Sequence, residues 1–147
     1  MQRPEWEDII MELAQTIAKR STCPRRSVGA VIFDQYDKRI VSLGYSGAPR
    51  GETHCSDRPG GCVINGHCGY SIHAEHNAIL HAKGDTDQYT LYTTHQPCDR
   101  CALVIRQARI RSVVYLHPYK SGPVAEQLIV MRQYVPLESS AEMYRKT

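Results

Sequence analysis

Two short fragments of the sequence carry side chains that could bind a metal ion and move a proton. His73 and Glu75 are separated by one residue, and Cys98 and Cys101 by two. Cysteines three positions apart share one face of a helix's first turn, where the partial positive charge of the N-terminus favours the thiolates that zinc needs. His73 and Glu75 would point roughly 200° apart on a helix with ~3.6 residues per turn. They cannot both ligate one ion, but at the start of a helix His73 can reach a metal while Glu75 extends past it.

The expected ligand set has the composition of a catalytic zinc site. His73, Cys98 and Cys101 provide three ligands and leave the fourth tetrahedral position for water. Two thiolates and a neutral imidazole balance the charge of Zn²⁺. The ion therefore acidifies water less than a three-histidine site does, and a nearby carboxylate becomes useful. We expect Glu75 to shuttle the proton, a general acid–base role typically worth ~10²–10⁴-fold in rate. A closed structural Cys/His knuckle is the alternative.

The elements around these fragments predict one α/β domain, residues 1–147, with helices on both faces of a sheet. Apolar periodicity and turn residues predict helices over 5–19, 72–83, 98–108 and 122–133, strands over 28–33, 39–45, 89–94 and 112–116, and a tail, 135–147, with a short strand and a helical turn. A cysteine-rich insert at about 46–71 has no periodicity. A compact domain seldom holds so long an irregular stretch unless it is functional, and a bound metal would order it.

Size and composition exclude several classes of protein. The chain has 147 residues, 41% of them hydrophobic and 22% charged, as in an ordinary globular domain. No apolar run approaches the ~18 residues of a membrane span, and the polar N-terminus has no secretory signal, so we expect a cytoplasmic protein without membrane contact. Six cysteines and seven histidines there indicate metal binding rather than disulfides. A net charge of +3 is a weak basic bias, and no nucleic-acid partner is expected.

Four blocks of sequence resemble the deoxycytidylate (dCMP) deaminases, a branch of the zinc-dependent cytidine deaminase superfamily. The blocks are CPRRSVGAV at 23–31, GYSGAPRG at 44–51, HAEHNAI at 73–79 and PCDRCA at 97–102. The last two contain the His-x-Glu and Pro-Cys-x-x-Cys signature of zinc nucleobase deaminases. The second block, with the cysteine-rich insert after it, separates this branch from tRNA adenosine deaminases and free-nucleoside deaminases. The resemblance covers roughly residues 6–130.

The resemblance implies a fold, a reaction and a mode of regulation. The implied fold is a three-layer α/β/α cytidine deaminase-like domain with a central mixed sheet of about five strands. The implied reaction is hydrolysis of dCMP to dUMP and ammonia, which feeds dTTP synthesis. The resemblance also implies a homohexamer that dCTP activates and dTTP inhibits, with Mg²⁺ on the triphosphate.

The resemblance also assigns roles to individual residues. By matching position, zinc is held by His73, Cys98 and Cys101, and Glu75 is the proton shuttle. Substrate contacts are expected from Arg26, Ser46, Ala74, Thr94 and Tyr119. Contacts to an allosteric nucleotide are expected from Gly44, Tyr45, Gly47, Arg50 and Gly51.

The chemistry of the side chain supports two of these assignments, and a third position differs from the family's usual residue. Arginine suits bidentate phosphate recognition, which favours Arg26 and Arg50, whereas Arg25 is expected at the surface or an interface. Ser46 stands where the family usually has asparagine, so one hydroxyl replaces an amide. Either water fills that gap or the substrate preference differs.

The remaining cysteines suggest a second metal site. The resemblance implies a structural zinc held by Cys23, Cys55, Cys68 and one of His67 or Cys62. Four protein ligands would close this site to water. Buried free thiols are the alternative.

Two other function classes remain open at this stage. A deaminase acting on cytosine or adenine in nucleic acid needs a basic groove and stacking aromatic side chains; one Trp and one Phe argue against it, although nine Tyr leave some room. A non-catalytic zinc interaction module would leave Glu75 without a task. Ammonia release from dCMP would distinguish a dCMP deaminase from both of these alternatives.

Overall fold

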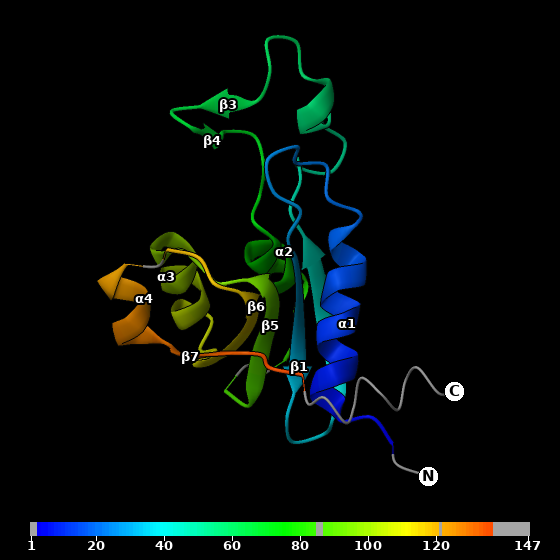
Figure 1. Ribbon diagram of the computed structural model, residues 1–147, viewed down its shortest axis with the longest axis vertical. Helices are drawn as coiled ribbons and strands as arrows, with labels where there is room; N and C mark the ends of the chain where they lie inside the picture. Colours follow the sequence, from blue (N-terminus) through cyan, green and yellow to red (C-terminus); the bar gives the residue numbers. More distant parts are fainter. Residues whose placement is uncertain (1–2, 85–86, 121, 137–147) are drawn as a thin grey trace.

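A mixed five-stranded sheet between layers of helices forms the centre of the protein (Figure 1). In this computed structural model, the described residues are 3–84, 87–120 and 122–136. The strands of the sheet are β1 (Gly29–Asp34), β2 (Arg39–Tyr45), β5 (Tyr89–His95), β6 (Ser112–His117) and β7 (Val130–Gln133). The helices are α1 (Trp6–Ala18), α2 (Ala74–His81), α3 (Asp99–Gln107) and α4 (Pro123–Leu128). The predicted three-layer α/β/α fold with a mixed sheet of about five strands is confirmed.

The order and direction of the strands place a predicted metal ligand at the carboxyl ends of the parallel strands. That order is β2-β1-β5-β6-β7. β2 and β5 pair antiparallel with β1, whereas β5, β6 and β7 run parallel to one another. Parallel strands need crossovers, which α3 and α4 supply. Ligand sites in such sheets lie beyond the carboxyl ends of the strands, and the turn from β5 into α3 carries Cys98 to that edge.

The two faces of the sheet bury different side chains because consecutive residues of a strand point to opposite sides. Val31 faces α1, while its neighbours Ala30 and Ile32 face the other helices. The α1 side holds the buried cluster Ile10, Met11, Ala14, Val31, Phe33, Tyr92, Val114 and Tyr134. The opposite side packs α2, α3 and α4 through alanines and aliphatic side chains, including Ala78, Ala102, Ile105, Val113 and Ala125.

Two glycines let helices approach the sheet closely. A Cβ at Gly29 would lie 2.0 Å from the Ala14 carbonyl oxygen of α1. A Cβ at Gly44 would lie 2.4 Å from the Ala74 carbonyl oxygen and 2.5 Å from the Ala78 amide nitrogen of α2. Gly44 was expected to contact an allosteric nucleotide, but the space beside it is filled by α2, the helix that carries Glu75.

The last predicted helix is wrong at its carboxyl end. Helix 122–133 was expected, but α4 ends at Leu128 and Val130–Gln133 form β7. Apolar residues at helical spacing extend the pattern, yet Met131 pairs with Val113 at the parallel sheet edge, and this tertiary pairing overrides local periodicity. The predicted strand and turn over 135–147 lie mostly outside the described residues. Within the described part of the chain, no helix has the length and apolar character needed to cross a membrane.

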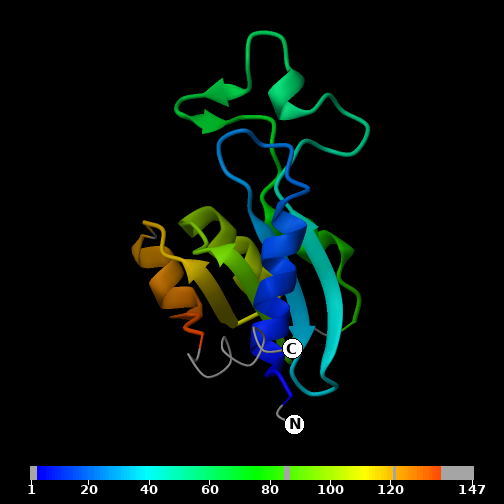
Figure 2. The same cartoon turned by 45° about the vertical axis from the view of Figure 1, so that its right-hand side comes forward.

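The cysteine-rich insert projects from one end of the sheet (Figures 1 and 2). It holds a short 3-10 helix, η1 (Cys55–Asp57), and a hairpin of β3 (Val63–Ile64) and β4 (His67–Cys68). A two-residue bridge closes its base, with the Gly47 amide donating to the Ile72 carbonyl at 3.2 Å and the reverse bond at 2.8 Å. The expected irregular stretch therefore contains a small hairpin.

Candidate active site

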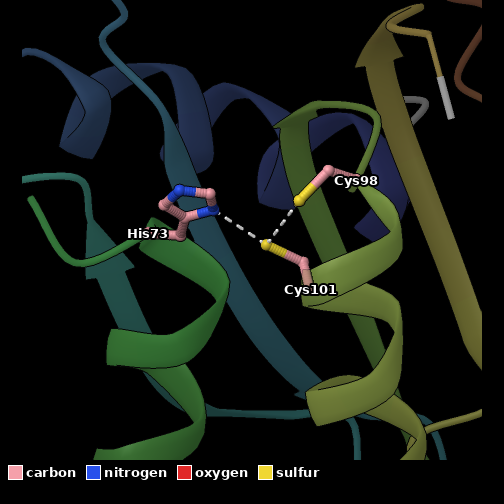
Figure 3. A group of neighbouring side chains, drawn as sticks. All are labelled: His73, Cys98 and Cys101. Atoms are coloured by element: carbon pink, nitrogen blue, oxygen red, sulfur yellow. Dashed lines mark hydrogen bonds between the residues drawn. The ribbon is translucent and has the colours of Figure 1, made fainter. Parts of the chain in front are cut away.

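Three predicted metal ligands meet between the starts of α2 and α3 (Figure 3). The ligand atoms of His73, Cys98 and Cys101 all lie within 4.8 Å of one another. The His73 Nδ1 atom is 2.9 Å from the Cys101 Sγ atom, which is 3.5 Å from the Cys98 Sγ atom. Within the described parts of the chain, no other Cys, His, Asp or Glu residues form so compact a group of three or more. One imidazole and two thiols are a donor set that fits Zn²⁺ and leaves a coordination position open.

Both ligand-bearing helices begin at a ligand. His73 is the N-cap of α2 and Cys98 is the N-cap of α3, each with extended backbone. Their carbonyls accept the first helical hydrogen bonds, from Asn77 at 3.1 Å and from Ala102 at 2.9 Å. The helices are therefore shorter at this end than the predicted 72–83 and 98–108. At the N-cap, His73 can point to the ion while Glu75, in the first turn, points past it.

The thiols of Cys98 and Cys101 have pKa values shifted in opposite directions. Hydrogen bonding from Cys101, and then from His73, lowers the pKa of Cys98 to about 3. The same Cys98 contact and burial raise the pKa of Cys101. Cys98 is thus ready to bind a cation as a thiolate, in keeping with its place at a helix N-terminus.

Glu75 is a buried carboxyl group beside the ligands. It is 4% exposed, and the Thr93 hydroxyl donates a hydrogen bond of 3.1 Å to its Oε1 atom. Its Oε2 atom lies 3.7 Å from the Cys101 sulfur. Burial raises the pKa of Glu75 above its ordinary value. A carboxyl that protonates more readily than usual, next to an open metal position, is suited to accept and return a proton.

A pocket of about 240 Å³ opens onto this group. Of the expected substrate contacts, Arg26, Ser46, Ala74 and Tyr119 line it. The Arg26 guanidinium carbon lies 4.1 Å from the centroid of the Tyr119 ring, which is a cation–π contact. Thr94 instead supports the backbone: its hydroxyl accepts a hydrogen bond of 3.2 Å from the Gly29 amide.

Several residues of the site, Val28 and Ser71 among them, were not assigned there from the sequence. Arg25, expected at the surface or an interface, lines the pocket and donates a hydrogen bond to the Gly66 carbonyl of the insert. His95 and Gln96 also line it. Burial, and then the charge of Arg26, lowers the pKa of His95 to about 4, so this imidazole is neutral at pH 7. Thr93 belongs to the site through its hydrogen bond to Glu75. The signal available in the sequence was that His95, the last residue of β5, and Gln96 directly precede the Pro97-Cys98 turn.

Cys23 and the three cysteines of the insert lie near the same pocket. Cys23 and Cys68 line the pocket, and Cys55 and Cys62 are buried. Burial alone would raise the pKa of Cys68, but hydrogen bonds from the Tyr70 backbone and the thiols of Cys62, Cys55 and Cys23 lower it. His67, the alternative fourth ligand, has an exposed side chain. All six cysteines of the chain are free thiols.

The block expected to hold an allosteric nucleotide, residues 44–51, has two parts. Gly44, Tyr45 and Gly47 are buried or half-buried, and a Cβ at Gly47 would lie 2.6 Å from the Thr22 hydroxyl oxygen. Arg50 and Gly51 are exposed. Gly51 has a φ of 88° and open space around it.

Comparison with known proteins agrees with this geometry. Residues 4–117 match the family described as the cytidine and deoxycytidylate deaminase zinc-binding region. The chain is 44% identical over 132 residues to ComE operon protein 2 of Bacillus subtilis, which covers 87% of this chain and 68% of that protein. It is 36% identical over 154 residues to the deoxycytidylate deaminase of Schizosaccharomyces pombe, covering 94% of this chain and 47% of that one. The chain thus spans about half the length of the yeast protein.

A phage relative and a solved structure match over nearly their whole length. The deoxycytidylate deaminase of Mycobacterium phage D29 is 37% identical over 126 residues, covering 78% of this chain and 97% of that protein. The crystal structure of dCMP deaminase from the cyanophage S-TIM5 in complex with dCMP and dUMP superposes with a TM-score of 0.76 at 27% identity, covering 91% of this chain and 100% of that one. The chain belongs to the cytidine and deoxycytidylate deaminase family.

Proposed function

We propose that this protein deaminates dCMP hydrolytically to dUMP and ammonia. The observation that carries the proposal is a pocket with two chemically different walls. The lining residues fall into two chemical sets: His73, Cys98, Cys101 and Glu75, which we call the catalytic wall, and Arg25 and Arg26, which we call the basic wall. Glu75 is the one carboxylate among the residues that line the pocket. A nucleoside monophosphate brings about 1.5–2 negative charges near pH 7, and arginine is the side chain best suited to hold them.

The residues of the catalytic wall divide the chemistry between them. Zinc, which His73, Cys98 and Cys101 would hold, would supply Lewis-acid activation of a water molecule. Glu75 would accept one proton of the attacking water and deliver it to the ring nitrogen, and would then carry the second proton, from the new hydroxyl on the reacting carbon, to the leaving amine. The Thr93 hydroxyl holds one oxygen of Glu75, so the other faces the ligand group. The burial of Glu75 keeps bulk water away from the proton transfer.

Relatives support the choice of substrate. The yeast and phage D29 proteins are named deoxycytidylate deaminases, and the cyanophage enzyme was crystallised with dCMP and dUMP. The basic wall distinguishes dCMP from free deoxycytidine, which has no phosphate for Arg26 to hold.

The proposal predicts a phosphate preference that depends on Arg26. We expect kcat/KM for dCMP to exceed that for deoxycytidine by at least tenfold, and Arg26→Ala to remove most of this preference, because a charge-assisted hydrogen bond contributes about 1.5–3 kcal/mol. Ammonia release from each substrate measures it. Arg39→Ala, which removes an exposed arginine from β2 outside the pocket, is the matched control. Equal kcat/KM values for the two substrates would contradict the proposal.

We also propose a second, structural zinc bound by Cys23, Cys55, Cys68 and Cys62. Cys62 is favoured over His67 because it is buried and interaction with its thiol lowers the pKa of Cys68, whereas His67 is exposed. Such a site would order an insert whose hairpin has two residues per strand.

Metal content tests the structural site. We expect two zinc ions per chain, one of which is lost in Cys62→Ser together with a drop in melting temperature, because a closed site contributes directly to folding. His67→Ala, the matched control, should retain both ions. A single zinc in the wild-type protein by elemental analysis would exclude the second site.

The finer expectations on regulation and assembly remain proposals. We propose that dCTP activates and dTTP inhibits, each bound with Mg²⁺ at residues 44–51, where exposed Arg50 and the open backbone at Gly51 support a triphosphate contact. We further propose one deaminase domain over residues 1–147, a homohexamer, and a cytoplasmic location, in which the six free thiols would stay reduced. Rates of dCMP turnover measured with and without each triphosphate test the proposed activation by dCTP and inhibition by dTTP.

A further inference from the structure

Ser46 is bonded through all of its polar atoms to one segment of the chain. This segment, residues 21–28, connects α1 to β1 and has no regular structure. The Ser46 amide donates to the Val28 carbonyl at 3.0 Å, and the Ser46 carbonyl accepts from the Thr22 amide at 3.2 Å. The Ser46 hydroxyl makes three further hydrogen bonds, to the Ser21 hydroxyl at 2.7 Å, the Val28 amide at 3.1 Å and the Arg26 carbonyl at 3.0 Å.

These bonds use the full capacity of the Ser46 hydroxyl. A serine hydroxyl has one proton to donate and two lone pairs to accept. Its proton goes to the Arg26 carbonyl, and its lone pairs accept from the Val28 amide and the Ser21 hydroxyl. Ser46 is 4% exposed although it lines the pocket. A substrate atom could bond to this hydroxyl only by displacing one of the three.

The segment that Ser46 holds carries the basic wall of the pocket. The two hydroxyl bonds to Arg26 and Val28 fix the backbone on both sides of residue 27, next to the Cα of Arg26. The Arg26 side chain then reaches the face of Tyr119, whose amide donates to the Gln96 side chain at 3.1 Å. A substitution of Ser46 would therefore affect the pocket by altering the position of the Arg26 guanidinium group.

We propose that Ser46 is a positioning residue that sets Arg26 for the phosphate, instead of contacting the sugar or base itself. The inference rests on the proposed dCMP deaminase function. It replaces the two readings of the serine given by the sequence, a water-filled gap or an altered base or sugar preference, with an effect confined to the phosphate end of the substrate.

The test is a double-mutant cycle between Ser46 and Arg26. We expect Ser46→Ala to raise KM for dCMP about tenfold with kcat within twofold of wild type, and to raise the dissociation constant for dUMP by a similar factor. For deoxycytidine, kcat/KM should change less than twofold. In an Arg26→Ala background, Ser46→Ala should have less than a twofold effect on either quantity, since the residue it positions is already gone.

Ser42→Ala is the matched control, because it removes another buried hydroxyl from β2, the strand that ends just before Ser46; this hydroxyl donates to the Ala78 carbonyl at 2.6 Å. It should lower the melting temperature about as much as Ser46→Ala and leave KM for dCMP within twofold. An equal loss with both substrates, or an undiminished loss in the Arg26→Ala background, would overturn the positioning role. A wild-type protein that turns over neither substrate rejects the proposed function itself, and with it the role of Ser46.

Discussion

Glu75→Gln should lower kcat for dCMP by at least a hundredfold while the protein keeps its zinc and its fold. Glutamine has nearly the shape of glutamate and can still accept the Thr93 hydrogen bond, but its amide cannot take a proton from water. A general acid–base step is typically worth about 10²–10⁴-fold, and a hundredfold loss corresponds to about 2.7 kcal/mol of transition-state stabilisation. Stability should not fall, because a buried carboxylate is replaced by a neutral group.

Three measurements separate this role from a structural one. Ammonia release gives kcat, elemental analysis gives zinc per chain, and thermal unfolding gives stability. Glu126→Gln, on the exposed side of α4, is the matched control and should leave all three unchanged. Retention of more than about a tenth of wild-type kcat by Glu75→Gln would leave less than ~1.4 kcal/mol for the proton shuttle and refute its role.

Gly44→Ala should destabilise the protein by about 3 kcal/mol or more. The added Cβ would meet the Ala74 carbonyl oxygen at 2.4 Å and the Ala78 amide nitrogen at 2.5 Å. Both are backbone atoms, so no rotation of a side chain relieves the contact and α2 must move off β2. Overpacking in a core costs about 1–3 kcal/mol when neighbours can adjust, and a backbone contact falls at or beyond the upper end of that range.

The displaced helix also carries His73 at its start and Glu75 in its first turn, so Gly44→Ala should lose activity as well as stability. For a chain of this size, a loss of about 3 kcal/mol lowers the melting temperature by roughly 10 °C. Gly60→Ala provides the control: its φ is 79° and nothing lies within 4 Å of the added atom, so its cost is confined to backbone strain of about 1 kcal/mol. Equal melting temperatures for the two variants would show that α2 does not press on Gly44.

Local patterns were sufficient for most of the fold because its elements are short and clearly patterned. β1 and β5 are continuous apolar or β-branched runs, and α1 has helical spacing of apolar residues, so each was predicted within about two residues. β7 was missed because an edge strand that follows a helix without a turn residue has no local signal. Its pairing with β6 depends on residues far away in the chain.

In the candidate site, too, some residues follow from a local sequence pattern and others depend on contacts between distant parts of the chain. His73, Cys98 and Cys101 could be grouped from the sequence because metal ligands impose residue types at fixed spacing, and Glu75 was noticed through its place beside His73. Arg25 has no such spacing, and its orientation toward Gly66 of the insert depends on how two loops fold against each other. The role of Gly44 required the position of α2, and the saturation of the Ser46 hydroxyl required every neighbour within hydrogen-bond distance.

The pocket is assembled from parts of the chain that are synthesised at very different times. Its walls come from the segment around Arg26, the base of the insert, the starts of α2 and α3, and Tyr119 beyond β6. A chain emerging from the ribosome contains every proposed zinc ligand once Cys101 is made, yet lacks the partner on which Arg26 stacks. Contacts so distant in sequence form late because loop closure must precede them. We therefore expect the group of His73, Cys98 and Cys101 to assemble before the contact between Arg26 and Tyr119.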